Sequence, residues 1–163
     1  MYLQVGMRLL SMLDIETSFD AKFYEDLDKR MEELLEKQIS YGYFADQISE
    51  VDNISIGTKA AIMEYGSVAR NIPSRPFLIR SARLLDKKLF RDLYVNHILL
   101  NKSLESAMKP IKDDCIASVQ ASIDSQKFAP LQPDTIRKKG NDVILIETSE
   151  MYDSVEVRIQ ENK

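Results

Sequence analysis

The sequence predicts an α+β fold, and three observations lead to this prediction. Apolar residues recur at helical spacing over two long stretches, residues 19–39 and 77–100. Near both ends of the chain, over residues 2–13 and 155–160, apolar and polar residues alternate as they do in half-buried strands. The length of 163 residues suits one compact domain, so we expect a single domain spanning residues 1–163.

The composition is that of an ordinary soluble globular protein, with 44% hydrophobic and 29% charged residues. No apolar run approaches the roughly 18 residues that a membrane span needs. The N-terminal residues lack a basic start and a long apolar stretch, so we expect neither a membrane segment nor a secretory signal. The single cysteine, Cys115, excludes an internal disulfide and fits assembly in a reducing cytoplasm.

In the first part of the chain, the alternation over residues 2–13 predicts a strand, and the apolar stripe over residues 19–39 predicts the clearest helix. The aromatic segment 41–44 is typical of a short strand, for which residues 48–54 would supply a return strand. Residues 56–66 then have Ala-rich helical spacing, with Gly66 placed to end a short helix.

The next segment, residues 64–77, predicts an ordered loop that leads into a helix. Pro73 and Pro76 are three residues apart and bar an ordinary helix between them. Ser74 is placed to cap the helix that follows, and Phe77 is expected to anchor its start in the core.

The second long helix is expected over residues 77–100, after which Ser103 can cap another helix that continues to about Asp124. Pro110 lies inside this last stripe and should kink the helix or mark a fresh start. Farther on, residues 134–140 and 147–153 predict short helical turns, and the alternation from Val155 predicts a final strand.

Charge is segregated along the chain. Residues 1–66 carry 6 basic and 13 acidic side chains, residues 67–112 carry 10 and 3, and residues 113–163 carry 6 and 10. Such segregation suits contact between unlike faces, either within the fold or between neighbouring copies. A solvated helix face is the alternative explanation.

The residues that usually carry catalysis or bind metal are scarce. His97 is the only histidine and lies at the edge of an apolar run, and Cys115 lies on an apolar helical stripe, so a structural role is expected for both. The sequence has no glycine-rich phosphate loop, no zinc-type spacing and no nucleophile elbow. We therefore predict no catalytic, metal-binding or cofactor-binding residue, and keep an enzyme built on carboxylates and His97 as a remote alternative.

The basic central helix raises a second alternative, a nucleic-acid-binding accessory protein. Its cations would be Arg80, Arg83, Lys87 and Arg91, which have the spacing needed to reach phosphates. A pI near 5.1, the absence of tryptophan and the few aromatics among these cations argue against a dedicated binder. A basic face matched to the acidic first helix of a neighbouring copy is at least as good an account, because one chain carries both.

Four motifs occur in a fixed order and carry a resemblance to a known family. They are Glu64-Tyr65-Gly66, Asn71-Ile72-Pro73-Ser74-Arg75-Pro76-Phe77, Pro130 to Gly140, and Leu145 to Val155. In this order they resemble the neck and tail-completion proteins of tailed phages, a group that includes virion morphogenesis proteins of Mu-like phages and minor tail proteins of lambda-like phages. The similarity covers about residues 56–159. One departure is Thr148-Ser149, where the family pattern usually has Thr-Gly.

The resemblance implies a small, mostly antiparallel sheet packed against two or three long helices, no catalysis, and no cofactor. It implies a virion protein, assembled in the host cytoplasm, whose copies form a ring of hexameric or dodecameric order at the head–tail junction. Its partners would be other neck, connector and tail proteins, with nonspecific contact to DNA in the channel and no contact with membrane. A tail terminator has the same requirements and stays open as an alternative. The residues expected at subunit contacts are Glu64, Asn71, Ile72, Pro73, Arg75, Pro76, Arg80, Arg83, Lys87 and Arg91, with Arg75 expected to reach a carboxylate in the same or an adjacent subunit.

Overall fold

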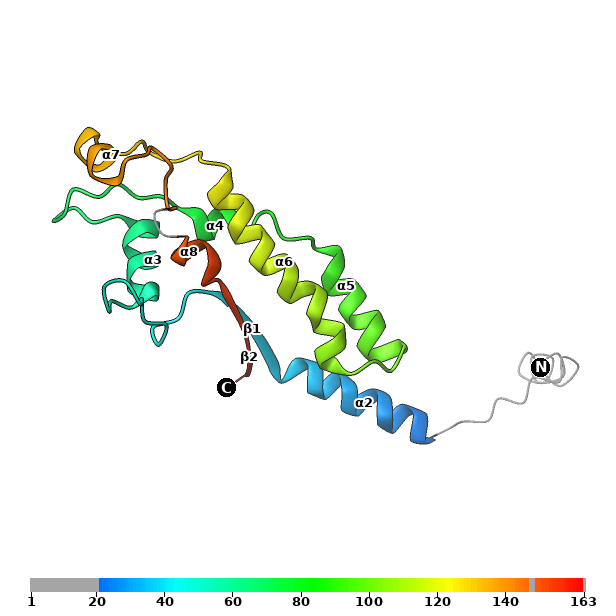
Figure 1. Ribbon diagram of the computed structural model, residues 1–163. Coiled ribbons are helices and arrows are strands. Elements are labelled where there is room, and N and C mark those ends of the chain that lie inside the picture. The colour runs from blue at the N-terminus through cyan, green and yellow to red at the C-terminus, as the bar shows by residue number, and fades with distance from the viewer. Residues whose placement is uncertain (1–20, 147–148, 163) are drawn as a thin grey trace, which may run out of the picture.

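The computed structural model describes residues 21–146 and 149–162, and it has the predicted α+β fold (Figure 1). The strand predicted over residues 2–13 lies outside the described residues. The elements are α2 (Ala21–Leu35), β1 (Lys37–Gly42), α3 (Ile56–Tyr65), α4 (Phe77–Ser81), α5 (Lys88–Tyr94), the π-helix η1 (Val95–Leu99), α6 (Leu104–Asp124), α7 (Pro133–Lys139), α8 (Glu150–Asp153) and β2 (Glu156–Glu161).

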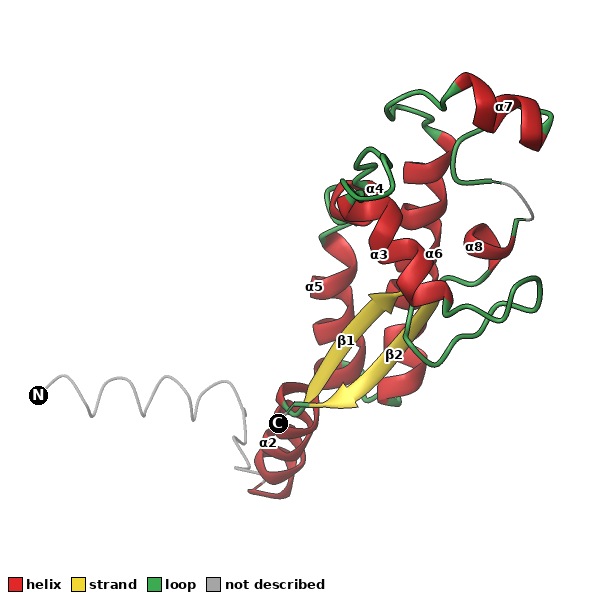
Figure 2. Cartoon of the chain, turned by 90° about the vertical axis from the view of Figure 1, so that its left-hand side faces the viewer, coloured by secondary structure: helices red, strands yellow, loops and turns green. Residues whose placement is uncertain are grey.

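The two strands β1 and β2 pair antiparallel, with Tyr41 opposite Val157 and Ile39 opposite Ile159 (Figure 2). The final strand is therefore confirmed. The strand predicted over residues 41–44 was expected to pair with residues 48–54, and this pairing was wrong. Residues 48–54 close only a tight turn through a bridge between Ile48 and Ser55. The first helix also ends earlier than predicted, since β2, more than 100 residues away in sequence, supplies the backbone partners that make residues 37–42 a strand.

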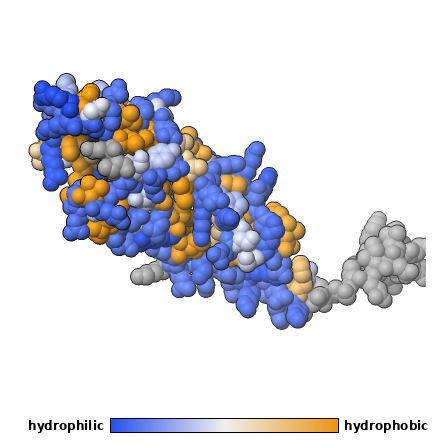
Figure 3. All heavy atoms as spheres, viewed as in Figure 1, coloured by the Kyte–Doolittle hydropathy of each residue, from blue (hydrophilic) through white to orange (hydrophobic). Residues whose placement is uncertain are grey.

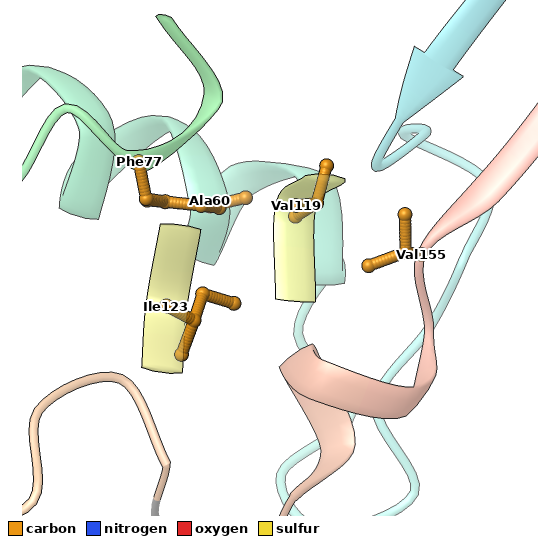
Figure 4. Close-up of a cluster of buried hydrophobic side chains, with 5 residues drawn as sticks. All are labelled: Ala60, Phe77, Val119, Ile123 and Val155. Atoms are coloured by element: carbon orange, nitrogen blue, oxygen red, sulfur yellow. The ribbon is translucent and has the colours of Figure 1, made fainter. Parts of the chain in front are cut away.

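The core follows α6, which contacts α4, α5 and both strands. One buried cluster joins α3, α4, α6 and the residue just before β2, and Figure 4 shows its members: Ala60, Phe77, Val119, Ile123 and Val155. A second cluster lies between α5 and α6, and consists of Leu93, Ala107, Met108, Ile111 and Cys115. The predicted anchoring of Phe77 is confirmed, since its side chain is fully buried and its carbonyl accepts a hydrogen bond from Ser122 Oγ (2.8 Å).

The single long helix predicted over residues 77–100 was wrong. Helix α4 ends at Ser81, the chain turns through residues 82–87, and α5 begins afresh at Lys88 before passing into the π-helix. Asp86 accounts for the break: its backbone N–H donates to Asp114 Oδ2 (2.9 Å) on α6, and its Oδ1 accepts from the N–H of Lys88 (2.9 Å). These hydrogen bonds satisfy N–H groups at the start of α5. The spacing of apolar residues, from which one helix was predicted, carries no information about such bonds.

Helix α6 agrees with its prediction at both ends, with Ser103 Oγ accepting from the N–H of Ser106 (3.4 Å) at its start. The helix runs without interruption through Pro110, so this proline does not mark a fresh start. Helix α7 confirms the turns predicted over residues 134–140, and Gly140 ends it in the left-handed conformation. Helix α8 confirms part of the turn predicted over residues 147–153, of which residues 147–148 lie outside the described residues.

The described body is elongated, and its two ends differ (Figures 1 and 2). Helix α2 projects at one end, and α3, α7 and the loop between α3 and α4 form the other. Figure 3 shows hydrophobic residues at the surface toward both ends, among mainly hydrophilic neighbours. Over the described residues, none of the helices combines the length and the apolar character needed to cross a membrane.

Candidate functional site

The candidate site is built on the loop between α3 and α4, residues 66–76, which we call the proline loop. Ser67 and Ile72 exchange backbone hydrogen bonds of 2.8 and 2.9 Å, which close the tip of the loop as a narrow hairpin. Asn71 takes a positive φ of 52°, a conformation that asparagine tolerates better than most residues. The loop is therefore ordered, as its sequence predicts.

Glu64, in the last turn of α3, holds the other end of this loop. Its carboxylate is buried and accepts hydrogen bonds from the backbone N–H groups of Leu78 (2.8 Å) and Ile79 (3.0 Å), in the first turn of α4. The prediction that Ser74 caps this helix was wrong: the Ser74 hydroxyl donates to the carbonyl of Glu64 (2.6 Å) instead. A carboxylate at this place both satisfies N–H groups without helical partners and faces the positive end of the helix dipole.

Arg75 is also buried, with 5% of its surface exposed. Its backbone N–H donates to the carbonyl of Met63 (2.7 Å), while its side-chain Nε donates to the carbonyl of Ala129 (3.3 Å). Burial lowers the pKa of this guanidinium. Among the described residues no carboxylate lies within ion-pair distance of Arg75, so the carboxylate expected for it is not supplied by this part of the chain.

Glu64 and Arg75 were predicted to lie at subunit contacts, but the fold places both inside the chain. The other residues of this motif are more accessible: Asn71 is exposed, and Ile72, Pro73 and Pro76 are half-buried. The sequence could not separate these two groups, because the burial of Glu64 and Arg75 depends on α4 and on the segment at Ala129.

A pocket of about 410 Å³ lies beside the proline loop, and we call it the loop pocket. Its walls come from α3, the proline loop, the α7 region, residues 144–145 and the start of α8. Residues of the second, third and fourth motifs line it, and the first motif is tied to it through Glu64. The lining residues are Lys59, Ile62, Met63, Arg70, Asn71, Ile72, Pro73, Arg75, Leu131, Gln132, Thr135, Lys139, Ile144, Leu145, Glu150 and Met151.

The lining combines an apolar floor with charged side chains. Four of the charged residues are basic and one is acidic. The acidic residue, Glu150, belongs to a network that the sequence analysis did not detect. Its Oε2 lies 3.2 Å from Lys59 Nζ and accepts from Ser49 Oγ (2.8 Å), and Lys59 Nζ also lies 2.8 Å from Asp52 Oδ1. The hydrogen bond from Ser49, followed by Lys59, lowers the pKa of Glu150. This network ties the turn before α3 to α8, and the described lining keeps more basic than acidic residues.

The predicted basic helix does not form one continuous face, because α4 and α5 are separate helices. Arg80 Nη1 donates to the carbonyl of Lys127 (2.7 Å), and its guanidinium stacks 4.8 Å from the centre of the Phe128 ring. Arg83 and Lys87 are exposed in the intervening turn. Arg91 is exposed on α5 and pairs with Asp92 (3.1 Å). Arg80 therefore stabilises the fold through its contacts with Lys127 and Phe128. The other three cations lie at the surface, two in the turn and one on α5.

His97 and Cys115 lie in the interior. His97 Nδ1 donates to the carbonyl of Lys102 (2.9 Å), and its Nε2 lies 3.4 Å from Glu33 Oε2 on α2. Cys115 is buried in the second core cluster, and burial, together with the charge of Asp114, raises the pKa of its thiol to about 11. Over residues 21–146 and 149–162, no cluster of three or more histidine, cysteine, aspartate or glutamate side chains could hold a metal ion.

The loop pocket and the proline loop are thus the features in which the motifs of the sequence meet. Comparison of the chain with protein-family models, with curated proteins and with solved structures gives no match.

Proposed function

We propose that this chain is a non-enzymatic structural protein of a tailed bacteriophage, whose copies form a ring in the neck or upper tail and help to join the DNA-filled head to the tail. One observation carries the proposal. The four motifs on which the family resemblance rests are separated by up to about 80 residues in sequence, yet three of them line the loop pocket, and the first is joined to the second by the hydrogen bond from Ser74 to the carbonyl of Glu64. Their common location supports a shared role for these residues.

The character of the proline loop supports a role in assembly. Its tip is closed by two backbone hydrogen bonds, and its base is held by Glu64 and by the N–H of Arg75. Pro73 and Pro76 restrict the chain further. A loop that is already ordered loses little conformational entropy when it binds, so more of the contact energy contributes to affinity.

The elongated body with two unlike ends also supports a ring. A contact between two different surfaces of identical subunits is heterologous, and repeated heterologous contacts close into a ring when the rotation between copies permits. We propose a hexamer or dodecamer assembled in the host cytoplasm and incorporated into the virion. It would contact other neck, connector and tail proteins, and the exposed cations Arg83, Lys87 and Arg91 would meet channel DNA without sequence preference.

The test is to inactivate the gene in the phage that encodes the protein and to examine the particles by electron microscopy. We expect DNA-filled heads and complete tails that remain unjoined, and restoration of joined particles when the wild-type gene is supplied in trans. Mass spectrometry of wild-type virions should detect the protein. Tails of abnormal length would instead indicate the tail-terminator role, and normal infectious particles without the protein would reject both roles.

A further inference from the structure

The loop pocket contains a buried cation, Arg75, for which the described part of the chain supplies no acidic partner. The proline loop contributes two charged residues to the lining, Arg70 and Arg75, and among the described residues the partners of the Arg75 guanidinium are the carbonyl of Ala129 and the Met63 sulfur. Burying a charge is costly unless it is paired. A carboxylate brought to this pocket together with apolar side chains would satisfy both the cation and the apolar floor.

Helix α2 carries the complementary chemistry on a surface that the body leaves exposed. Tyr24, Asp28, Met31 and Leu35 are spaced i, i+4, i+7 and i+11, so they form one line along the helix, which we call the outer stripe. Tyr24 is 47% exposed, Met31 38% and Leu35 72%. Glu32 is exposed beside this line. The body packs against a different edge of α2, where Leu34 contacts the second core cluster.

Helix α2, which carries the outer stripe, and the α7 region, which lines the loop pocket, lie at opposite ends of the described body (Figures 1 and 2). Within one chain they therefore do not meet. In two copies arranged head to tail, the α2 end of one copy faces the pocket end of the next. The size of the pocket, about 410 Å³, suits a few side chains of a docked helix rather than the helix itself.

We propose that the outer stripe of α2 in one copy docks onto the loop pocket of a second copy, with its apolar side chains on the pocket floor and Asp28 or Glu32 facing Arg70 and Arg75. This inference names the subunit contact of the proposed ring, and it rests on that proposal for closure into a ring. The second copy supplies the carboxylate that the described part of the chain does not.

Charge favours this contact over pairing of two α2 helices with each other. Helix α2 has five acidic and three basic residues, so two such helices side by side repel. The lining of the loop pocket has the opposite excess. A heterologous contact therefore brings unlike charges together, whereas an α2–α2 dimer brings like charges together.

Charge reversal on each side tests the proposal with the full chain. The pocket variant is Arg70→Glu, and the stripe variant combines Asp28→Lys with Glu32→Lys; all three side chains are exposed, so the fold should persist and circular dichroism checks it. By native mass spectrometry and sedimentation velocity, the wild type should form closed oligomers, and each variant alone should associate at least tenfold more weakly. A one-to-one mixture of the two variants should restore oligomers in which the variants alternate, because the lysines introduced in one stripe then face the glutamate introduced at the other pocket, while the unchanged stripe faces the unchanged pocket.

Matched controls are Lys88→Glu on α5 and Asp26→Lys on another face of α2, which should assemble as the wild type does. A wild type that stays monomeric, variants that assemble alone, or a mixture that fails to assemble would each overturn the proposed contact. An α2–α2 dimer would appear as unchanged association of the pocket variant. Virions that contain the protein while the mixture fails would reject this contact and leave the proposed function standing.

Discussion

At the scale of single residues, Gly66 and Gly140 provide a matched pair. Both have a φ of 77°, but a Cβ at Gly66 would lie 2.7 Å from the carbonyl oxygen of Ile72 and from the nitrogen of Ser74, whereas a Cβ at Gly140 would meet nothing within 4 Å. Gly66 also has a ψ of −179°, in a region that only glycine normally occupies. The family resemblance places Gly66 in a motif, and these contacts give the physical reason for a glycine there.

We expect Gly66→Ala to destabilise the protein by about 3 kcal/mol or more, because it adds a backbone clash to the conformational strain. Gly140→Ala should cost only about 1 kcal/mol, since it adds strain in the left-handed region without a clash. Urea unfolding followed by circular dichroism measures both. Equal losses of stability for the two variants would show that the close approach of Ile72 and Ser74 to Gly66 adds nothing to the cost of a side chain at this position.

At the scale of elements, local patterns predicted what local chemistry determines. The capping serine Ser103, the stripe of α6 and the glycine after α7 each lie within or next to the element that they define, and those helices were predicted correctly. The fold of residues 77–100 was missed because Asp86 and Asp114, 28 residues apart, fix the break between α4 and α5. The apolar spacing continues through this break and therefore predicts one helix.

In the candidate site, too, features set by the local sequence could be predicted, and features set by contacts between distant residues could not. Residues 64–77 and the two downstream motifs could be singled out from the sequence, and the structure brings them around one pocket. The capping of α4 by Glu64 and the network of Glu150, Lys59 and Asp52 could not be predicted. Both depend on hydrogen bonds between elements whose relative placement is set by the core.

The break between α4 and α5 gives a prediction at this scale. Asp114→Ala should remove the acceptor of the Asp86 N–H, destabilise the protein by about 1 kcal/mol and speed hydrogen exchange in residues 82–90. Asp113→Ala, the same change one residue earlier at an exposed position, should alter neither quantity measurably. If both variants exchange alike, the hydrogen bond between α6 and the turn does not hold the break.

At the scale of the whole molecule, the two terminal parts of the described chain are joined to the core in different ways. Strand β2 pairs with β1 along its length, and Val157 and Ile159 pack on the second core cluster. None of residues 22–35 in helix α2 is fully buried, and the helix touches that cluster through Leu34. We infer that β2 is required for folding and that α2 is required for assembly.

Two truncations test this difference. Removal of residues 156–163 should prevent folding, because β1 loses its partner and the second cluster loses two side chains. Removal of residues 1–35, a much longer segment, should leave a folded chain whose thermal midpoint falls by less than about 10 °C, since the described part of the removed segment, α2, contributes little apolar area to the core. The same chain should be monomeric by sedimentation velocity, because it lacks the outer stripe. A shortened chain that lacks α2 and still forms rings would place the subunit contact elsewhere, and one that unfolds would show that α2 belongs to the core.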